Sequence, residues 1–177
     1  ITKESAKAFV NFEPYKKDNT VVSVSKIDPS LLRRNDLTKI ALFNRGKSIQ
    51  ANLFLHGNRI ASHAKRIMFP VGFGNCKTSV DLCGYHTRTT RERINGVLDA
   101  LGYDFRVAQR KGEQVLVRKI NPIPQNVLDV FKLDLIESPK EQVLKLSDDR
   151  FEPNFAQRVF DSKEFVSGTD LNAITDF

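Results

Sequence analysis

The stretch from residue 87 to residue 119 constrains the fold more than any other part of the chain. Thr89 and Glu92 have the spacing of a capping box, in which the N-cap hydroxyl and the N3 side chain bond to each other's backbone amides. Gly102 stands where a glycine commonly ends a helix. Between them, apolar residues recur at helical spacing: Ile94, Val97, Leu98 and Leu101. Alternating residues at 104–109 and 114–119 then predict a β-hairpin with a basic turn at 110–113.

Most of the remaining basic part of the chain consists of short strands separated by turns. Alternating, β-branched residues predict a strand from Thr20 to Ile27. Further strands are predicted at 38–43, 48–55 and 59–62, joined into a meander by glycine-containing turns at 44–47 and 56–58. An irregular stretch at 63–79 leads to a short strand at 80–83. We therefore predict an α+β fold: a curved antiparallel β-sheet with one central helix and short flanking helices, one capped by Thr2 and one at 154–160.

The charge is unevenly distributed along the chain. Residues 1–119 contain 22 Lys and Arg against 10 Asp and Glu, a net charge of +12, and residues 120–177 contain 6 against 11, a net charge of −5. We expect a basic nucleic-acid-binding domain at 1–146 and an acidic, partly flexible C-terminal tail at 147–177. Such a tail would occupy a basic groove until a polyanion displaced it. The alternative is that the basic residues only solvate the surface.

Single-stranded DNA is the polyanion that this pattern favours, because cations neutralise phosphates and neighbouring rings stack on bases. The helix predicted after residue 87 carries cations in its first turn, where they oppose the helix dipole unless an anion lies nearby. The predicted phosphate contacts are Arg45, Lys47, Arg59, Lys65, Arg66, Arg88, Arg91, Arg93, Arg110 and Lys111. The predicted stacking rings are Phe54, Phe69, Phe73 and Tyr85, although a single Phe more often packs in a core.

Motifs for catalysis are missing from the sequence. It contains no Gly-x4-Gly-Lys-Ser/Thr loop and no nucleophile elbow. Zinc could be bound only by a set whose spacing fits no common zinc motif, namely Cys76, Cys83 and His86 with His56 or His63. A metal-dependent nuclease would require the fold to gather scattered carboxylates: Asp81, Asp99, Asp104 and Glu113. We therefore expect no enzyme activity and no cofactor, with the nuclease kept as an alternative.

Three segments resemble a small module found among uncharacterised tailed-phage proteins. The module has a Gly-Asn turn, a Thr-Arg-x-Arg-Ile-Asn helix and an Arg-Lys-Gly hairpin, which correspond here to residues 57–58, 90–95 and 110–112. The last two residues, Asp176 and Phe177, are similar to the acidic, Phe-ending tails of bacterial and phage single-stranded DNA-binding proteins. The first resemblance implies a phage protein without a catalytic assignment, and the second implies that Asp176 and Phe177 contact a protein partner.

These resemblances make the functional expectation more specific. We expect a phage-type, sequence-tolerant single-stranded DNA-binding protein that assists a phage RNA polymerase or replication proteins. A phage interaction or virion protein without a nucleic-acid role is the alternative. Two cysteines are too few for a disulfide framework, and no apolar run is long enough to cross a membrane. We therefore expect a protein of the cytoplasm of an infected bacterial host, without membrane association. We also expect a homo-oligomer.

Overall fold

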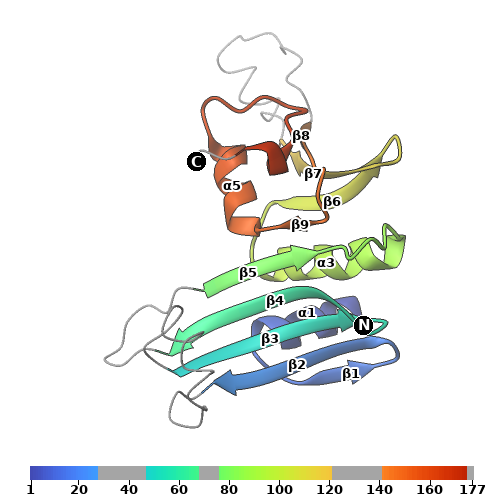
Figure 1. The fold of residues 1–177 in the computed structure, drawn as a ribbon, viewed down its shortest axis with the longest axis vertical. Coiled ribbons are helices and arrows are strands. Elements are labelled where there is room, and N and C mark those ends of the chain that lie inside the picture. Colours follow the sequence, from blue (N-terminus) through green and yellow to red (C-terminus); the bar gives the residue numbers. More distant parts are fainter. Residues whose placement is uncertain (28–46, 68–75, 121–140, 175–177) are drawn as a thin grey trace, which may run out of the picture.

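The computed structural model of the 177-residue chain describes residues 1–27, 47–67, 76–120 and 141–174 (Figure 1). The predicted α+β class is confirmed, but the strands form two antiparallel sheets instead of one: a six-stranded sheet in the order β1-β2-β3-β4-β5-β9 and a three-stranded sheet in the order β6-β7-β8. The elements are α1 (Thr2–Val10), β1 (Tyr15–Lys17), β2 (Thr20–Ile27), β3 (Lys47–Leu55), β4 (Asn58–Ile67), β5 (Cys76–Asp81), α3 (Arg88–Ala100), β6 (Phe105–Arg110), β7 (Glu113–Lys119), β8 (Glu141–Lys145), β9 (Arg150–Phe151), α5 (Pro153–Asp161) and the 3-10 helix η2 (Leu171–Ala173).

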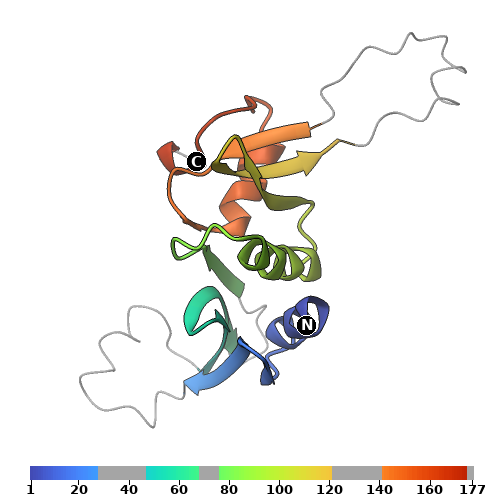
Figure 2. The same ribbon diagram turned by 90° about the vertical axis from the view of Figure 1, so that its right-hand side faces the viewer.

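The six-stranded sheet has an inner face, covered by α1 and α3, and an outer face (Figure 2). Successive side chains of a strand point to opposite faces, so the cross-strand register decides what each face presents. One row on the inner face is apolar across five strands: Val22, Leu53, Ala61, Val80 and Phe151. The next row, on the outer face, is polar and exposed or half-buried: Ser23, Asn52, Ser62 and Ser79.

The C-terminal part of the chain completes the core next to the three-stranded sheet. Phe160 of α5 packs between Phe105 and Phe165, with ring centroids 5.4 Å from each. Leu144 of β8 and Leu171 of η2 are buried in the same cluster. The segment 147–174 therefore packs against the body, and α5 covers the helix predicted at 154–160. That residues 147–177 form a partly flexible tail stays a prediction. The spaced apolar residues of this segment have a surface to bury against, and composition alone does not show that surface.

Several local predictions are corrected by the structure. Thr87, not Thr89, caps α3: its side-chain oxygen accepts a hydrogen bond from the Thr90 amide at 3.3 Å. β4 and β5 extend through most of the stretch predicted to be irregular. Both edges of β3 are paired, with β2 and with β4. The predicted strand 38–43 lies outside the described residues.

Other local predictions are confirmed. β2 has the predicted bounds, and the turn of the β6–β7 hairpin contains Lys111 and Gly112 with φ of 51° and 80°. His56 and Gly57 form the same kind of positive-φ turn between β3 and β4. Among the helices that the structure describes, none has the length and apolar character needed to cross a membrane.

Candidate nucleic-acid interface

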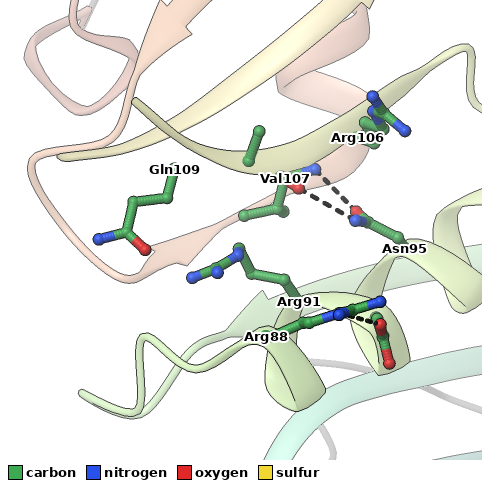
Figure 3. Close-up of a pocket in the computed structure, with 8 residues that line it drawn as sticks. Arg88, Arg91, Asn95, Arg106, Val107 and Gln109 are labelled. Atoms are coloured by element: carbon green, nitrogen blue, oxygen red, sulfur yellow. Dashed lines mark hydrogen bonds and ion pairs between the residues drawn. The ribbon is translucent and has the colours of Figure 1, made fainter. Parts of the chain in front are cut away.

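A groove of about 420 Å³ lies between α3 and the free edge of β6 (Figure 3). β6 pairs with β7 on one side only, so the Val107 backbone turns its N–H and C=O toward α3. Asn95 satisfies both groups: its amide nitrogen donates to the Val107 carbonyl at 3.0 Å, and its amide oxygen accepts from the Val107 N–H at 2.7 Å. The side chain of Asn95 thus pairs with β6 as a neighbouring strand would. It holds α3 and β6, the two walls of the groove, together.

The α3–β6 groove is lined by three arginines and one carboxylate. Arg88 and Arg91 extend from the first turn of α3, and Arg106 extends from β6 (Figure 3). The Arg88 side chain is 88% exposed and its Nε lies 2.8 Å from the Glu92 carboxylate. An ion pair this exposed contributes little stability and exchanges readily for another anion. Because α3 has no acidic residue in its first turn, its positive dipole end also favours an anion here.

Arg91 is held in place more firmly than Arg88. One of its terminal nitrogens donates to the His86 carbonyl at 2.9 Å and to the Gln114 side-chain oxygen at 3.5 Å. Gln114 is buried, and its amide nitrogen is, in the described part of the chain, a buried side-chain donor without a partner. Gln109, which lines the groove, lies directly opposite Gln114 in the hairpin register. Polar groups therefore gather at the end of the groove near Arg91.

A second, smaller pocket lies on the outer face of the six-stranded sheet. It has a volume of about 150 Å³, and its lining includes Arg59 at the start of β4 and Arg150 of β9. Arg150 Nε lies 3.7 Å from an oxygen of Asp81. Phe54 is half-buried and pairs with Arg59 across the β3–β4 ladder. We call this the Arg59–Arg150 pocket.

The predicted site residues are divided between these places. Arg88 and Arg91 line the groove, Arg110 and Lys111 are exposed at the hairpin tip, and Tyr85 is 54% exposed just before α3. Lys65 is exposed on β4, away from the residues that line either pocket. Arg45, Phe69, Phe73, Asp176 and Phe177, and the side chains of Lys47 and Arg66, lie outside what the structure describes.

Arg93 is half-buried and bonded within the protein, whereas a phosphate contact is expected to be exposed. Its guanidinium donates to the side-chain oxygens of Thr20, at 3.2 Å, and Thr2. The side chain therefore ties α3 to β2 and α1. Arg106 was missed by the sequence analysis, although it alternates with the buried Phe105 and Val107 on a predicted strand and is thereby marked as solvent-facing.

The residues considered for a metal site are directed to other partners. His63 is buried and its Nδ1 lies 2.8 Å from the Thr78 hydroxyl oxygen, whereas Cys76 is exposed on β5. The Cys83 thiol donates to the Arg59 carbonyl at 3.2 Å, and His86 Nε2 lies 2.6 Å from an Asp149 oxygen. Within the described ranges, no three His, Cys, Asp or Glu side chains come together as a metal site would require.

One protein family matches most of the chain. Residues 1–132 match a family model described as Kyanoviridae Gp96 protein. The match includes α1, α3 and strands β1 to β7, so the α3–β6 groove lies wholly within it. Comparisons with curated proteins and with solved structures gave no match.

Proposed function

Because the chain belongs to the Kyanoviridae Gp96 protein family and is therefore a phage protein, we propose that it binds single-stranded DNA in the α3–β6 groove. The observation that carries the proposal is the composition of the groove: Arg88, Arg91 and Arg106 against the single carboxylate of Glu92. Two of these guanidinium groups, those of Arg88 and Arg91, extend from the start of α3, and that of Arg106 extends from β6 on the other wall of the groove. Such groups suit the phosphates of a nucleic-acid backbone, which release bound counterions when they are neutralised.

The shape of the site favours a single strand over a duplex. The arginines lie in a recess between a helix and a strand edge, and Asn95 holds the two walls together. A protein that reads duplex DNA more often projects a helix into the major groove. α3 instead has Ile94, Val97 and Leu98 buried in the core, and its exposed residues lie near its start (Arg88, Thr89, Glu92) and at its end (Asp99, Ala100). An extended strand with separated phosphates fits this recess better than a duplex does.

The wider role in the proposal is that of a sequence-tolerant cofactor for a phage RNA polymerase or for replication proteins, acting as a homo-oligomer in the cytoplasm of the infected host. Backbone contacts by arginine carry no sequence information, which supports sequence tolerance. The polymerase or replication partner would be contacted through Asp176 and Phe177.

Binding is tested by fluorescence anisotropy with a labelled oligo(dT) of about 16 nucleotides, a length that covers the site sizes common for single-strand binders. The double variant Arg88→Gln/Arg106→Gln is expected to bind about tenfold more weakly at about 0.15 M salt, where attraction between distant charges is screened. The slope of log K against log salt should become shallower by about 0.7 for each phosphate that is no longer neutralised. Neither arginine carries a hydrogen bond within the core in the described structure, so the unfolding temperature should change little.

The matched control is Arg158→Gln/Lys163→Gln, which removes two exposed cations from α5 and the residues that follow it. This variant has the same net charge as the groove variant and is expected to bind within about twofold of the original chain, because long-range attraction alone is screened by salt. Equal weakening in both double variants would show that net charge, and not the groove, binds the DNA. Binding that favours the duplex of the same length would contradict the proposed preference.

A further inference from the structure

The turn that joins β5 to α3 carries an exposed aromatic ring, and hydrogen bonds hold its backbone. Tyr85 is 54% exposed, and among the large hydrophobic side chains of the described residues only Val166 is more exposed. The two residues before it, Cys83 and Gly84, both adopt positive φ, at 56° and 76°. The Tyr85 N–H donates to the Leu82 carbonyl at 3.0 Å and closes the turn.

Two carboxylates, of Asp81 and Asp149, accept hydrogen bonds from the backbone of this turn. Asp81 accepts a hydrogen bond from the Cys83 N–H at 2.8 Å, and Asp149 accepts one from the Gly84 N–H at 2.7 Å. The other Asp149 oxygen lies 2.6 Å from His86 Nε2. All three backbone amides that precede His86 therefore have partners. An exposed ring on a backbone held this way needs little further ordering before a ligand stacks on it.

The turn also connects the two cationic sites. On one side, the His86 carbonyl accepts from Arg91, which lines the α3–β6 groove. On the other side, the Cys83 thiol donates to the backbone carbonyl of Arg59, and Asp149 precedes Arg150 in the chain. Arg59 and Arg150 line the pocket on the outer face of the six-stranded sheet. The turn that carries Tyr85 is thus hydrogen-bonded to one residue of the groove, Arg91, and to one residue of the Arg59–Arg150 pocket, Arg59.

We propose that Tyr85 is a base-stacking platform at the middle of a continuous single-strand path, with phosphates bound in the α3–β6 groove on one side and in the Arg59–Arg150 pocket on the other. This inference rests on the proposed function and extends it to a second cationic site. Base stacking on an aromatic ring tolerates any sequence, because every base has a π-face. The carboxylates along the path are engaged: Asp81 and Asp149 accept backbone hydrogen bonds and lie beside Arg150 and His86 respectively.

A core role for Tyr85 does not account for the same observations. A tyrosine that packs for stability has a mostly buried ring, as Tyr103 does beside Phe105, with centroids 5.3 Å apart. Tyr85 is instead exposed, on a turn that is hydrogen-bonded to Arg91 of the groove and to Arg59 of the outer pocket. The ring is therefore available for contact with a ligand that also carries negative charge.

The test measures binding of oligo(dT) of about 16 and about 4 nucleotides to Tyr85 variants. Tyr85→Ala is expected to bind the longer oligonucleotide about tenfold more weakly, with an unchanged unfolding temperature, and Tyr85→Phe is expected to bind within about twofold of the original chain, because the ring and not the hydroxyl stacks. Arg59→Gln/Arg150→Gln should weaken binding of the longer oligonucleotide and leave the binding of the short one, which the groove alone can hold, nearly unchanged.

A spectroscopic measurement detects stacking at position 85 directly, independently of any change in affinity. The chain contains no tryptophan, so Tyr85→Trp introduces a single indole at this position. Stacking of thymine on the indole should quench its fluorescence upon addition of oligo(dT). Val166→Trp, at a 67% exposed position after α5, is the control and should not be quenched.

The outcomes separate the two proposals. If oligo(dT) binds with the predicted dependence on Arg88 and Arg106 but Tyr85→Ala binds equally well and Tyr85→Trp is not quenched, the path is wrong and the groove proposal stands. If oligo(dT) does not bind the original chain at all, both proposals fail.

Discussion

His63 shows how a residue suspected of metal binding can serve packing instead. Its ring packs against two aromatic rings, with centroids 5.7 Å from Phe9 and 5.1 Å from Phe12. Its Nδ1 contacts the Thr78 hydroxyl at 2.8 Å. Burial, and to a smaller extent the charge of Lys65, lowers the pKa of His63 below its ordinary value of 6.5. The neutral imidazole is therefore the form that the folded chain accommodates.

The lowered pKa of His63 predicts a pH-dependent stability. Between the lowered pKa of the folded chain and 6.5, the unfolded chain binds the proton more readily, so the free energy of unfolding falls as the pH decreases through 6.5. Above 6.5 this contribution is constant. Thermal unfolding between about pH 7.5 and about pH 5 is expected to show a falling midpoint, and His63→Leu is expected to show a smaller fall.

The exposed His56 supplies the control for this prediction. His56→Gln should keep the pH dependence of the original chain, because it removes an exposed imidazole and leaves the buried one in place. An equal fall for His63→Leu and the original chain would show that other groups cause the dependence.

At the residue scale, the sequence predicts turn residues well and side-chain partners poorly. The positive-φ turns at Gly57 and Gly112 follow from local chemistry alone, and the structure has both. The N-cap is displaced by two residues because Thr87 and Thr89 both satisfy the composition rule and only the chain path decides between them. Arg93 is indistinguishable from Arg91 in sequence, yet its guanidinium reaches threonines of distant elements.

At the scale of elements, the contact between α1 and α3 depends on a glycine inside a helix. A Cβ atom added at Gly96 would lie 2.6 Å from the Thr2 Cγ2 atom and 3.3 Å from the Thr2 carbonyl oxygen. Thr2 cannot easily turn away, because its hydroxyl accepts a hydrogen bond from Arg93. Gly96 therefore allows the close approach of the two helices that cover the inner face.

We predict that Gly96→Ala destabilises the fold although alanine is the better helix former. The gain in helix propensity is about 1 kcal/mol, and overpacking costs about 1 to 3 kcal/mol, so the free energy of unfolding should fall by about 1 kcal/mol. In a Thr2→Ser background, which removes Cγ2 and keeps the hydroxyl, the same substitution should be neutral or stabilising. Denaturant unfolding of the four chains gives the coupling; independent effects of the two substitutions would contradict this account of the contact.

The sequence predicts the kinds of elements more reliably than their neighbours. Alternation and helical spacing locate β2, the hairpin β6–β7 and α3, because these signals lie within each segment. Pairing is a property of the whole sheet. β3 takes β2 as its neighbour across a long connection, and β9, far along the chain, adds to the edge of β5. The α3–β6 groove likewise depends on the free edge of β6, which no local pattern shows.

At the scale of the whole molecule, the acidic C-terminal part is joined to the basic part through specific pairs. Arg118 of β7 lies 2.7 Å from an Asp161 oxygen, and His86 lies 2.6 Å from Asp149. Exposed ion pairs contribute little stability by themselves, whereas buried apolar side chains contribute more. The packing of the C-terminal residues therefore determines whether this part of the chain can leave the body.

Truncation of the chain distinguishes two possibilities for residues 147–177: a folded part of the domain or a tail that can be displaced. A chain that ends at Leu146 lacks five buried side chains of the core: the small Ala156 and the four larger ones of Phe151, Val159, Phe160 and Leu171. Losing a single large core side chain costs about 2 to 5 kcal/mol, so losing the four larger ones costs about 8 to 20 kcal/mol, which is as large as the roughly 5 to 15 kcal/mol that keeps a typical domain folded. We expect this chain to show no cooperative thermal transition by circular dichroism, whereas a chain that ends at Ile174 should unfold like the original. A shortened chain that ends at Leu146, folds normally and binds oligo(dT) more tightly than the original would instead establish residues 147–177 as a competing tail.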